Sequence, residues 1–146
     1  MAQWIETKRR DNKVMENGAV KKVTEPYLVD ALSFAEAEAR IIEEMKPYIS
    51  GEFTVSAVKK AKIAEVVGDQ DAGRYFLAKV GFITLDEKSG AEKAAMSQML
   101  VGGEDFQAAF GILLNELRTT VSDWKIISLA KTPIHGILPA NLSENE

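Results

Sequence analysis

The chain contains an internal repeat, because the same pattern of residues returns 72 positions further along. A fixed internal period of this kind is the signature of a duplicated structural unit. Conservative replacements such as Ile41 with Leu113 and Met45 with Leu117 lie between the identities. Identical pairs include Gly18 and Gly90, Ala19 and Ala91, Lys21 and Lys93, Leu28 and Leu100, Val29 and Val101, Phe34 and Phe106, Ala37 and Ala109, Glu44 and Glu116, Ser56 and Ser128, and Lys59 and Lys131. The repeat predicts two halves with the same order of elements.

Each half begins with the pattern of a β-hairpin. Asn17-Gly18 in the first half is a tight-turn sequence, since glycine accepts the positive φ that hairpin turns need. Alternation of apolar and polar residues then predicts further strands. The expected strands cover residues 3–15, 19–29, 52–66, 74–85, 92–101 and 124–131. Both faces of 74–85 are largely apolar, so this strand is expected in the centre of a sheet.

One helix is expected in each half. Ser33 and Asp105 are suitable N-caps, and Glu36 completes a capping box with Ser33. Pro47 is expected to mark the end of the first helix. Apolar residues at helical spacing give each helix one buried stripe, with Phe34 and Phe106 in equivalent core positions. The two stripes are Phe34, Ala37, Ile41, Met45 and Ile49, and Phe106, Ala109, Leu113, Leu117 and Val121.

These elements predict an α+β fold of two pseudo-symmetric ββαβ repeats. The simplest arrangement is one largely antiparallel six-stranded sheet with both helices on one face. A single domain is expected over residues 1–132, with the repeats at 1–67 and 74–132. Residues 133–146 are expected to form a C-terminal extension that is flexible at its end.

Composition restricts the function classes. The chain has no cysteine, no apolar leader and no stretch long enough to span a membrane, which indicates a cytoplasmic protein. His135 is the only histidine, and no nucleotide-binding, phosphate-loop or metal-ligand motif is present. A catalytic base needs an oriented partner, and none is evident for His135. We therefore expect a protein that is not an enzyme and that holds no metal and no cofactor.

Two aromatic–lysine pairs suggest a nucleic-acid surface. Trp4 and Lys8 are four residues apart and share one strand face, and Tyr75 and Lys79 repeat the pair in the second half. An aromatic ring can stack on a base while an ammonium meets the phosphate, so the pairs fit single-stranded DNA or RNA. The expected interface, on the helix-free sheet face, comprises Trp4, Lys8, Arg10, Lys21, Lys59, Tyr75, Lys79, Lys93 and Lys131. The alternative is that both aromatics belong to the core.

Two other functions remain open. Phe110 and Leu114 add an apolar strip to the second helix, which suggests a protein partner or a homo-oligomer. Burial of this strip in a deeper groove is the simpler interpretation. A small-ligand binder with a pocket between the halves is the third possibility.

Several strings in the first half resemble a known family. They are Trp4-Ile5-Glu6-Thr7-Lys8, Val14-Met15-Glu16-Asn17-Gly18, Val23-Thr24-Glu25-Pro26-Tyr27-Leu28-Val29-Asp30-Ala31, Glu36-Ala37-Glu38-Ala39-Arg40-Ile41 and Tyr48-Ile49-Ser50-Gly51-Glu52-Phe53. The chain is similar over about residues 1–132 to an uncharacterised domain-of-unknown-function family of small proteins from gut anaerobes and their phages. The resemblance implies a small, phage-linked protein and transfers no catalytic or binding residue.

Overall fold

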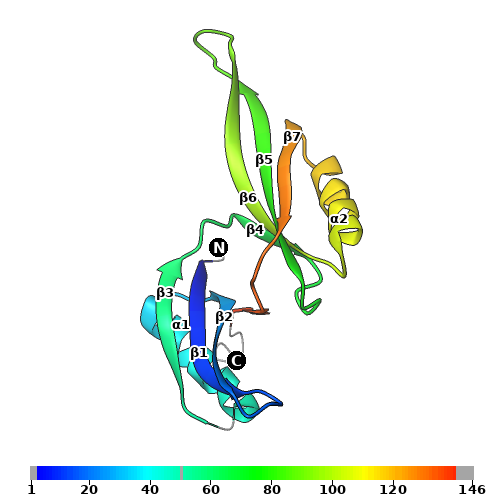
Figure 1. The fold of residues 1–146 in the computed structure, drawn as a ribbon. Helices are drawn as coiled ribbons and strands as arrows, with labels where there is room; N and C mark the ends of the chain where they lie inside the picture. The colour runs from blue at the N-terminus through cyan, green and yellow to red at the C-terminus, as the bar shows by residue number, and fades with distance from the viewer. Residues whose placement is uncertain (1–2, 50, 141–146) are drawn as a thin grey trace. The chain divides into compact units, whose positions relative to one another are not determined.

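The computed structural model describes residues 3–49 and 51–140. The described chain forms two compact units: unit 1 is residues 3–49, 51–61 and 133–140, and unit 2 is residues 62–132. The elements are β1 (Trp4–Val14), β2 (Val20–Asp30), α1 (Phe34–Met45), the 3₁₀ turn η1 (Lys46–Tyr48), β3 (Phe53–Lys60), β4 (Glu65–Gly68), β5 (Tyr75–Leu85), β6 (Glu92–Gly102), α2 (Phe106–Arg118), β7 (Asp123–Lys131) and β8 (Gly136–Leu138) (Figure 1). The α+β class expected from the sequence is confirmed.

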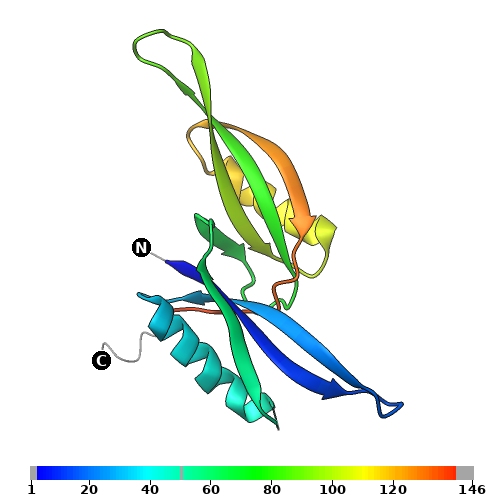
Figure 2. The same ribbon diagram turned by 60° about the vertical axis from the view of Figure 1, so that its left-hand side comes forward.

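Unit 1 is a four-stranded mixed sheet with one helix. Its strand order is β3-β1-β2-β8, in which β1 is antiparallel to β2 and β3 while the short β8 runs parallel to β2. Helix α1 lies along one face of this sheet (Figure 2). The other face is called here the helix-free face of unit 1.

Unit 2 has the same kind of sheet. Its strand order is β4-β6-β5-β7, with β5 antiparallel to β6 and β7, and with the short β4 parallel to β6. Helix α2 packs on one face of it (Figure 1). The expectation that residues 74–85 form a central strand is confirmed, because β5 has a neighbour on each side.

The expected single six-stranded sheet is wrong. The strand expected at 52–66 is two strands, β3 and β4, and these belong to different sheets. Residues 136–138, expected in an extension, form β8 and pair with β2. Strands of three or four residues are too short to show a period of two, so their partners cannot be found from the sequence pattern. The tail at 141–146 lies outside the described residues.

The local signals for turns and caps agree with the structure. Gly18 and Gly90 turn the two long hairpins with φ of 82° and 67°. The Ser33 hydroxyl accepts a hydrogen bond from Glu36 N–H at 3.0 Å, and the Asp105 carboxylate accepts from Ala108 N–H at 2.8 Å. Glu36 closes the capping box one residue earlier than expected, since its carboxylate accepts from the N–H of the residue before Ser33.

Each unit has its own core between helix and sheet. The buried members in unit 1 are Ile5, Tyr27, Val29, Ala31, Ala37, Ile41 and Leu138. Those in unit 2 are Val67, Phe76, Ala78, Val80, Met99, Val101, Ala109, Leu113 and Leu117.

Phe34 and Phe106 are not in these cores, which corrects the prediction from helical spacing. They are 52% and 50% exposed, and each is the first residue of its helix. Helical side chains lean toward the N-terminus, so a side chain in the first position projects past the helix end instead of over the sheet. Phe106 makes an edge-on contact with Phe76, with ring centroids 6.2 Å apart.

Candidate functional site

The two aromatic residues proposed for base stacking are buried. Trp4 is 6% exposed and Tyr75 is 1% exposed, so neither ring offers a face to a base. The alternative given above, that these rings pack inside the protein, is confirmed. The Tyr75 hydroxyl donates a hydrogen bond to the Gln70 carbonyl. Trp4 and Tyr75 are therefore removed from the proposed interface.

The expected basic positions do not all share the helix-free faces. Lys8 and Arg10 alternate with the core residue Ile5 and lie on the helix-free face of unit 1. Lys59 also lies there, opposite Glu6, with its Nζ 3.3 Å from the Glu6 carboxylate. Lys79 has the corresponding position on unit 2, where it is exposed.

Three lysines point to the other side of their sheets. Lys131 pairs with the core residue Phe76, and Lys93 pairs with Thr84, two residues beyond the partly buried Phe82. Lys21 pairs with Lys13 on the helix side of unit 1. Lys59 and Lys131, which the 72-residue offset aligns, thus face opposite sides. A slip of one residue reverses the face of a strand residue, and this explains the error.

The helix-free face of unit 1 is nevertheless basic. Lys8, Arg10 and Lys22 share it, and none of them has an ion pair within the described residues 3–49 and 51–140. The acidic residues of α1 lie on the opposite side of the sheet, among them Glu36, Glu38, Glu43 and Glu44. Unit 1 thus has this basic group on one face and the acidic helix on the other, where Lys13 and Lys21 also lie.

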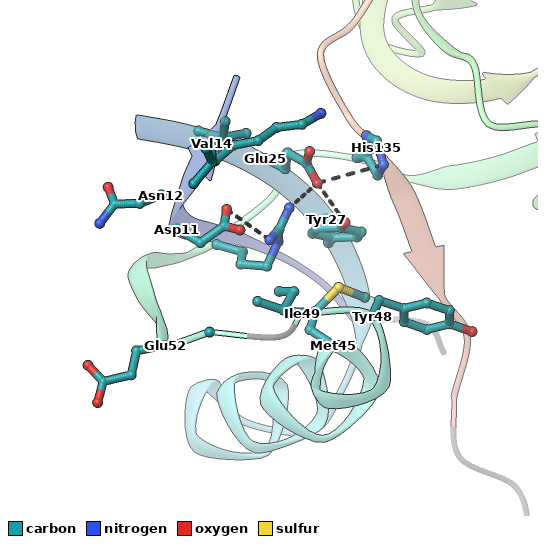
Figure 3. A pocket seen from close by; sticks show the side chains of 14 residues that line it. Asp11, Asn12, Val14, Glu25, Tyr27, Met45, Tyr48, Ile49, Glu52 and His135 are labelled. Atoms are coloured by element: carbon teal, nitrogen blue, oxygen red, sulfur yellow. Dashed lines mark hydrogen bonds and ion pairs between the residues drawn. The ribbon is translucent and has the colours of Figure 1, made fainter. Parts of the chain in front are cut away.

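A groove opens on the helix side of unit 1, and it is the strongest candidate site. It has a volume of about 680 Å³ and is formed by unit 1 alone (Figure 3). The sheet supplies a polar wall, and the end of α1 with η1 supplies Met45, Tyr48 and Ile49 on the other side. The lining residues are Arg9, Asp11, Asn12, Lys13, Val14, Val23, Glu25, Tyr27, Met45, Tyr48, Ile49, Gly51, Glu52 and His135.

Arg9 is the centre of the polar wall. It is 6% exposed, which is rare for an arginine unless it is paired. Its Nη1 lies 2.9 Å from Asp11 Oδ1, and its Nη2 donates to Glu25 Oε2. The Nε of Arg9 is buried and has no hydrogen-bond partner in the described part of the chain. One guanidinium therefore holds two carboxylates and keeps an unused donor.

Glu25 collects further partners. The Tyr27 hydroxyl donates to Glu25 Oε2 at 3.0 Å, and His135 Nε2 lies 3.7 Å from the same oxygen. The His135 ring meets Tyr27 edge-on, with centroids 5.5 Å apart and an interplanar angle of 68°. Three strands or their flanks thus converge on one carboxylate (Figure 3).

This network changes the acidity of its members. Burial alone would raise the pKa of Glu25, but the hydrogen bonds from Arg9 and Tyr27 dominate and lower it below the ordinary 4.5. Burial, with the hydrogen bond to Glu25, raises the pKa of Tyr27 to about 12. Burial opposes the charge on Arg9, yet the hydrogen bond to Glu25 leaves its pKa above the ordinary value. Arg9 and Glu25 are thus both charged near neutral pH, while Tyr27 keeps its proton.

The same register in unit 2 carries three apolar residues and one serine. Arg9 of β1 pairs with Glu25 of β2, and the pairing of β1 with β3 is irregular between Lys8 and Arg9. Val80 faces Ser97, and it directly follows the matching irregularity between β5 and β7. By this register, Asp11 and Tyr27 correspond to Phe82 and Met99, which belong to the core of unit 2 or pack on it.

His135 also has a counterpart in unit 2. The His135 N–H donates to the Pro26 carbonyl at 2.8 Å, and the Ala64 N–H donates to the Gln98 carbonyl at 2.8 Å. Unit 2 therefore shows that this sheet can be completed with apolar side chains. The strand order alone thus does not account for the charged cluster of unit 1, and buried charges that the fold does not account for are common at functional sites.

Sequence reasoning missed every member of this cluster except His135, which it set aside for lack of a partner. A signal was present in β1, where Ile5, Thr7, Arg9 and Asp11 alternate on the inward face. An arginine in an inward position indicates a buried ion pair. Its partners Glu25 and His135 come from distant segments, so only the folded chain identifies them.

The apolar strip on α2 is partly open. Phe110 is 39% exposed and Leu114 is half-buried, so burial inside the monomer does not account for Phe110. Together with the half-exposed Phe106 they follow one side of the helix at four-residue spacing.

If this strip mediates self-association, Phe110→Glu should shift the protein toward a smaller sedimentation coefficient, because a charge would replace buried apolar area. Sedimentation velocity over a range of concentrations measures this, and Phe34→Glu on α1 is the matched control, at a half-exposed helix position of unit 1. Identical, concentration-independent profiles for both variants and the parent would contradict the prediction.

No helix in residues 3–49 and 51–140 combines the length and apolarity needed to cross a bilayer. Within the same residues, no three side chains of the histidine, cysteine, aspartate or glutamate type are grouped as metal ligands would be.

Comparison with known proteins gives a family but no activity. No curated protein matches the chain, and no solved structure matches it. A family model with the description "Domain of unknown function (DUF4494)" matches residues 3–140, which include both units and the whole groove. The resemblance to a family of unknown function is thus confirmed. The chain belongs to the DUF4494 family.

Proposed function

We propose that this protein is a binding domain, not an enzyme, and that it holds a small polar ligand in the groove of unit 1. The observation that carries the proposal is the buried Arg9–Asp11–Glu25 cluster in a groove of about 680 Å³. Unit 2 has three apolar residues and one serine in the same register, so a sheet of this strand order forms there without such a cluster. Concave sites with a few convergent polar groups and an apolar wall are the usual form of small-molecule sites.

Filling the groove tests the proposal. Fragments added to the full-length ¹⁵N-labelled protein should shift amide signals of the groove, and Val23→Trp should abolish these shifts by occupying the space. Ala95→Trp is the matched control, because Ala95 pairs with Phe82 as Val23 pairs with Asp11. Fragment shifts that persist in Val23→Trp, or that never involve groove amides, would contradict the proposal.

We also propose that the two units are copies of one duplicated ββαβ segment, each completed by a short parallel strand. Matching backbone hydrogen bonds support this. Ala61 N–H donates to the Trp4 carbonyl and Thr132 N–H donates to the Tyr75 carbonyl, both at 2.9 Å. An experimental structure tests it, since β1-β2-α1-β3 should superpose on β5-β6-α2-β7. The offset is then 71 residues in the first and third strands, which accounts for the reversed face of Lys131.

A second candidate function is single-stranded nucleic-acid binding on the helix-free face of unit 1. The specific observation in its favour is that the exposed Arg10 and Lys22 and the half-buried Lys8 share a face away from the acidic helix. With Trp4 and Tyr75 buried, the binding would depend on phosphate contacts and not on stacking.

Adjacent lysines give a sharp test of this second function. Lys22→Ala should weaken binding and lower the salt slope of log K by about 0.7, because one phosphate contact is lost. Lys21→Ala should leave both unchanged, since Lys21 faces the helix side. Fluorescence anisotropy with a labelled oligonucleotide at low salt measures both variants. Equal losses for the two lysines, or no binding by the parent, would remove this candidate.

A further inference from the structure

The charges in the groove indicate which class of ligand it takes. Arg9 has one positive charge, and the two carboxylates on it, Asp11 and Glu25, have two negative charges. At the rim of the groove Lys13 and Glu52 have opposite charges. The Arg9, Asp11 and Glu25 side chains together therefore have an excess of one negative charge.

The two carboxylate side chains are more exposed than the guanidinium that they share. The Arg9 side chain is 7% exposed, whereas those of Asp11 and Glu25 are 16% and 24% exposed. Within this ion-pair network, a ligand in the groove therefore has more contact with the carboxylates than with the guanidinium. Tyr27 does not alter this, because its hydroxyl already donates to Glu25.

The wall opposite the carboxylates is apolar. Met45 and Ile49 lie across the groove from Asp11 and Glu25, and the ring of Tyr48, which is 81% exposed, points outward beside Met45 (Figure 3). An exposed tyrosine can hold a cation against its ring or cover an apolar stem. The groove thus offers acceptors on one side and apolar surface on the other.

We infer that the groove of unit 1 binds a small organic cation, an ammonium on an apolar or aromatic stem. The inference rests on the proposed small-ligand function of this groove and adds the charge of the ligand. The ammonium donates to the free oxygens of Glu25 and Asp11 and balances the excess negative charge, while the stem packs on Met45 and Ile49. An anion in the groove would lie close to two carboxylates, and the single positive charge of Arg9 is already paired with both of them. Like charges at close range repel, so an anion is disfavoured.

Three probes of one shape and different charge test the inference. Benzylamine, benzyl alcohol and benzoate are titrated into the full-length ¹⁵N-labelled protein. Benzylamine should shift groove amides with an affinity on the order of tenfold higher than benzyl alcohol, because charge-assisted hydrogen bonds exceed neutral ones. Benzoate should cause no saturable shift there.

Two variants locate the effect. Glu25→Gln should reduce benzylamine affinity on the order of tenfold. Glu44→Gln on α1 removes the same charge outside the groove lining and should leave the affinity unchanged. Because Glu25→Gln disturbs the Arg9 network and can impair folding, Asp11→Asn serves as the second variant, and near-ultraviolet circular dichroism checks that each variant is folded.

The outcomes distinguish the inference of a cationic ligand from the proposed small-ligand function of the groove. Benzyl alcohol or benzoate binding as tightly as benzylamine overturns the cation inference and leaves the groove as a ligand site. No groove shift with benzylamine at millimolar concentration also overturns it, while the fragment test with Val23→Trp decides the proposed function separately. Equal losses in Glu25→Gln and Glu44→Gln overturn it too, since the attraction would then be nonspecific.

Discussion

Arg9→Met is expected to destabilise unit 1 by about 3–5 kcal/mol, because it leaves two carboxylates close together without their cation. The side chains of Asp11 and Glu25 are 16% and 24% exposed, so water replaces the lost partner only in part. Each unit contains one tryptophan, Trp4 or Trp124. Urea unfolding followed by fluorescence in a Trp124→Phe background therefore reports on unit 1.

The matched control replaces the whole cluster by the residues of unit 2. The combined variant Arg9→Val, Asp11→Phe, Glu25→Ser and Tyr27→Met should be as stable as the parent or more stable by about 1–4 kcal/mol, as observed when buried ion pairs give way to packed apolar groups. A combined variant less stable than Arg9→Met alone would show that the charged cluster is structural, and the argument for a dispensable, functional cluster would be lost.

The pH dependence of unit 1 follows from the same contact. The pKa of Glu25 is below 4.5 in the folded chain, so the unfolded chain binds the proton more tightly. The stability from the Arg9–Glu25 pair is therefore fully present above about pH 4.5 and is lost as the pH falls through the lower, folded pKa. Glu25→Gln should remove this acid-induced loss. An unchanged pH profile in that variant would assign the loss to other carboxylates.

Leu113→Ala is expected to destabilise unit 2 by about 2–5 kcal/mol, because a fully buried leucine leaves a cavity when it is shortened. Leu113 has no exposed surface and belongs to the core between α2 and its sheet. Phe106→Ala should cost about half as much or less, since Phe106 is 50% exposed and makes one edge-on ring contact. Trp124 fluorescence in a Trp4→Phe background measures both.

Helical spacing alone predicts the opposite order for these two residues, because it gives Phe106 the larger buried side chain. Equal losses for Leu113→Ala and Phe106→Ala would indicate that Phe106 is more deeply packed than the structure shows. Ile41→Ala is the corresponding core change in unit 1. It removes no contact within unit 2, so the unfolding transition followed by Trp124 fluorescence should stay where it is.

The positions of the residues expected in the nucleic-acid interface could be predicted only in part. The basic residues Lys8 and Arg10 were placed correctly on a helix-free face, because strand alternation is a local property. Trp4 and Tyr75 were expected to be exposed on the same faces by the same alternation, but both are buried. Alternation indicates the face on which a side chain lies and not whether that side chain is exposed. Lys131 was misplaced because a fixed offset of 72 residues aligns it with Lys59, whereas its pairing with the core residue Phe76 places it on the helix side.

The amino-acid sequence by itself determined the long strands and the two helices of this protein. The hairpin turns at Gly18 and Gly90, the caps at Ser33 and Asp105, and the order of the long strands all depend on interactions within a few residues. Such interactions are readable because a turn or a cap needs a particular residue at a particular place.

Only the tertiary structure decided which segments meet. The strands β4 and β8 are too short to show a pattern, and their pairing divides the chain into two sheets where one was expected. The same pairing of β8 with β2 brings His135 within 3.7 Å of Glu25, which is more than a hundred residues away along the chain. Contacts of this kind depend on the whole fold, so the groove and its charged cluster became visible only in the folded protein.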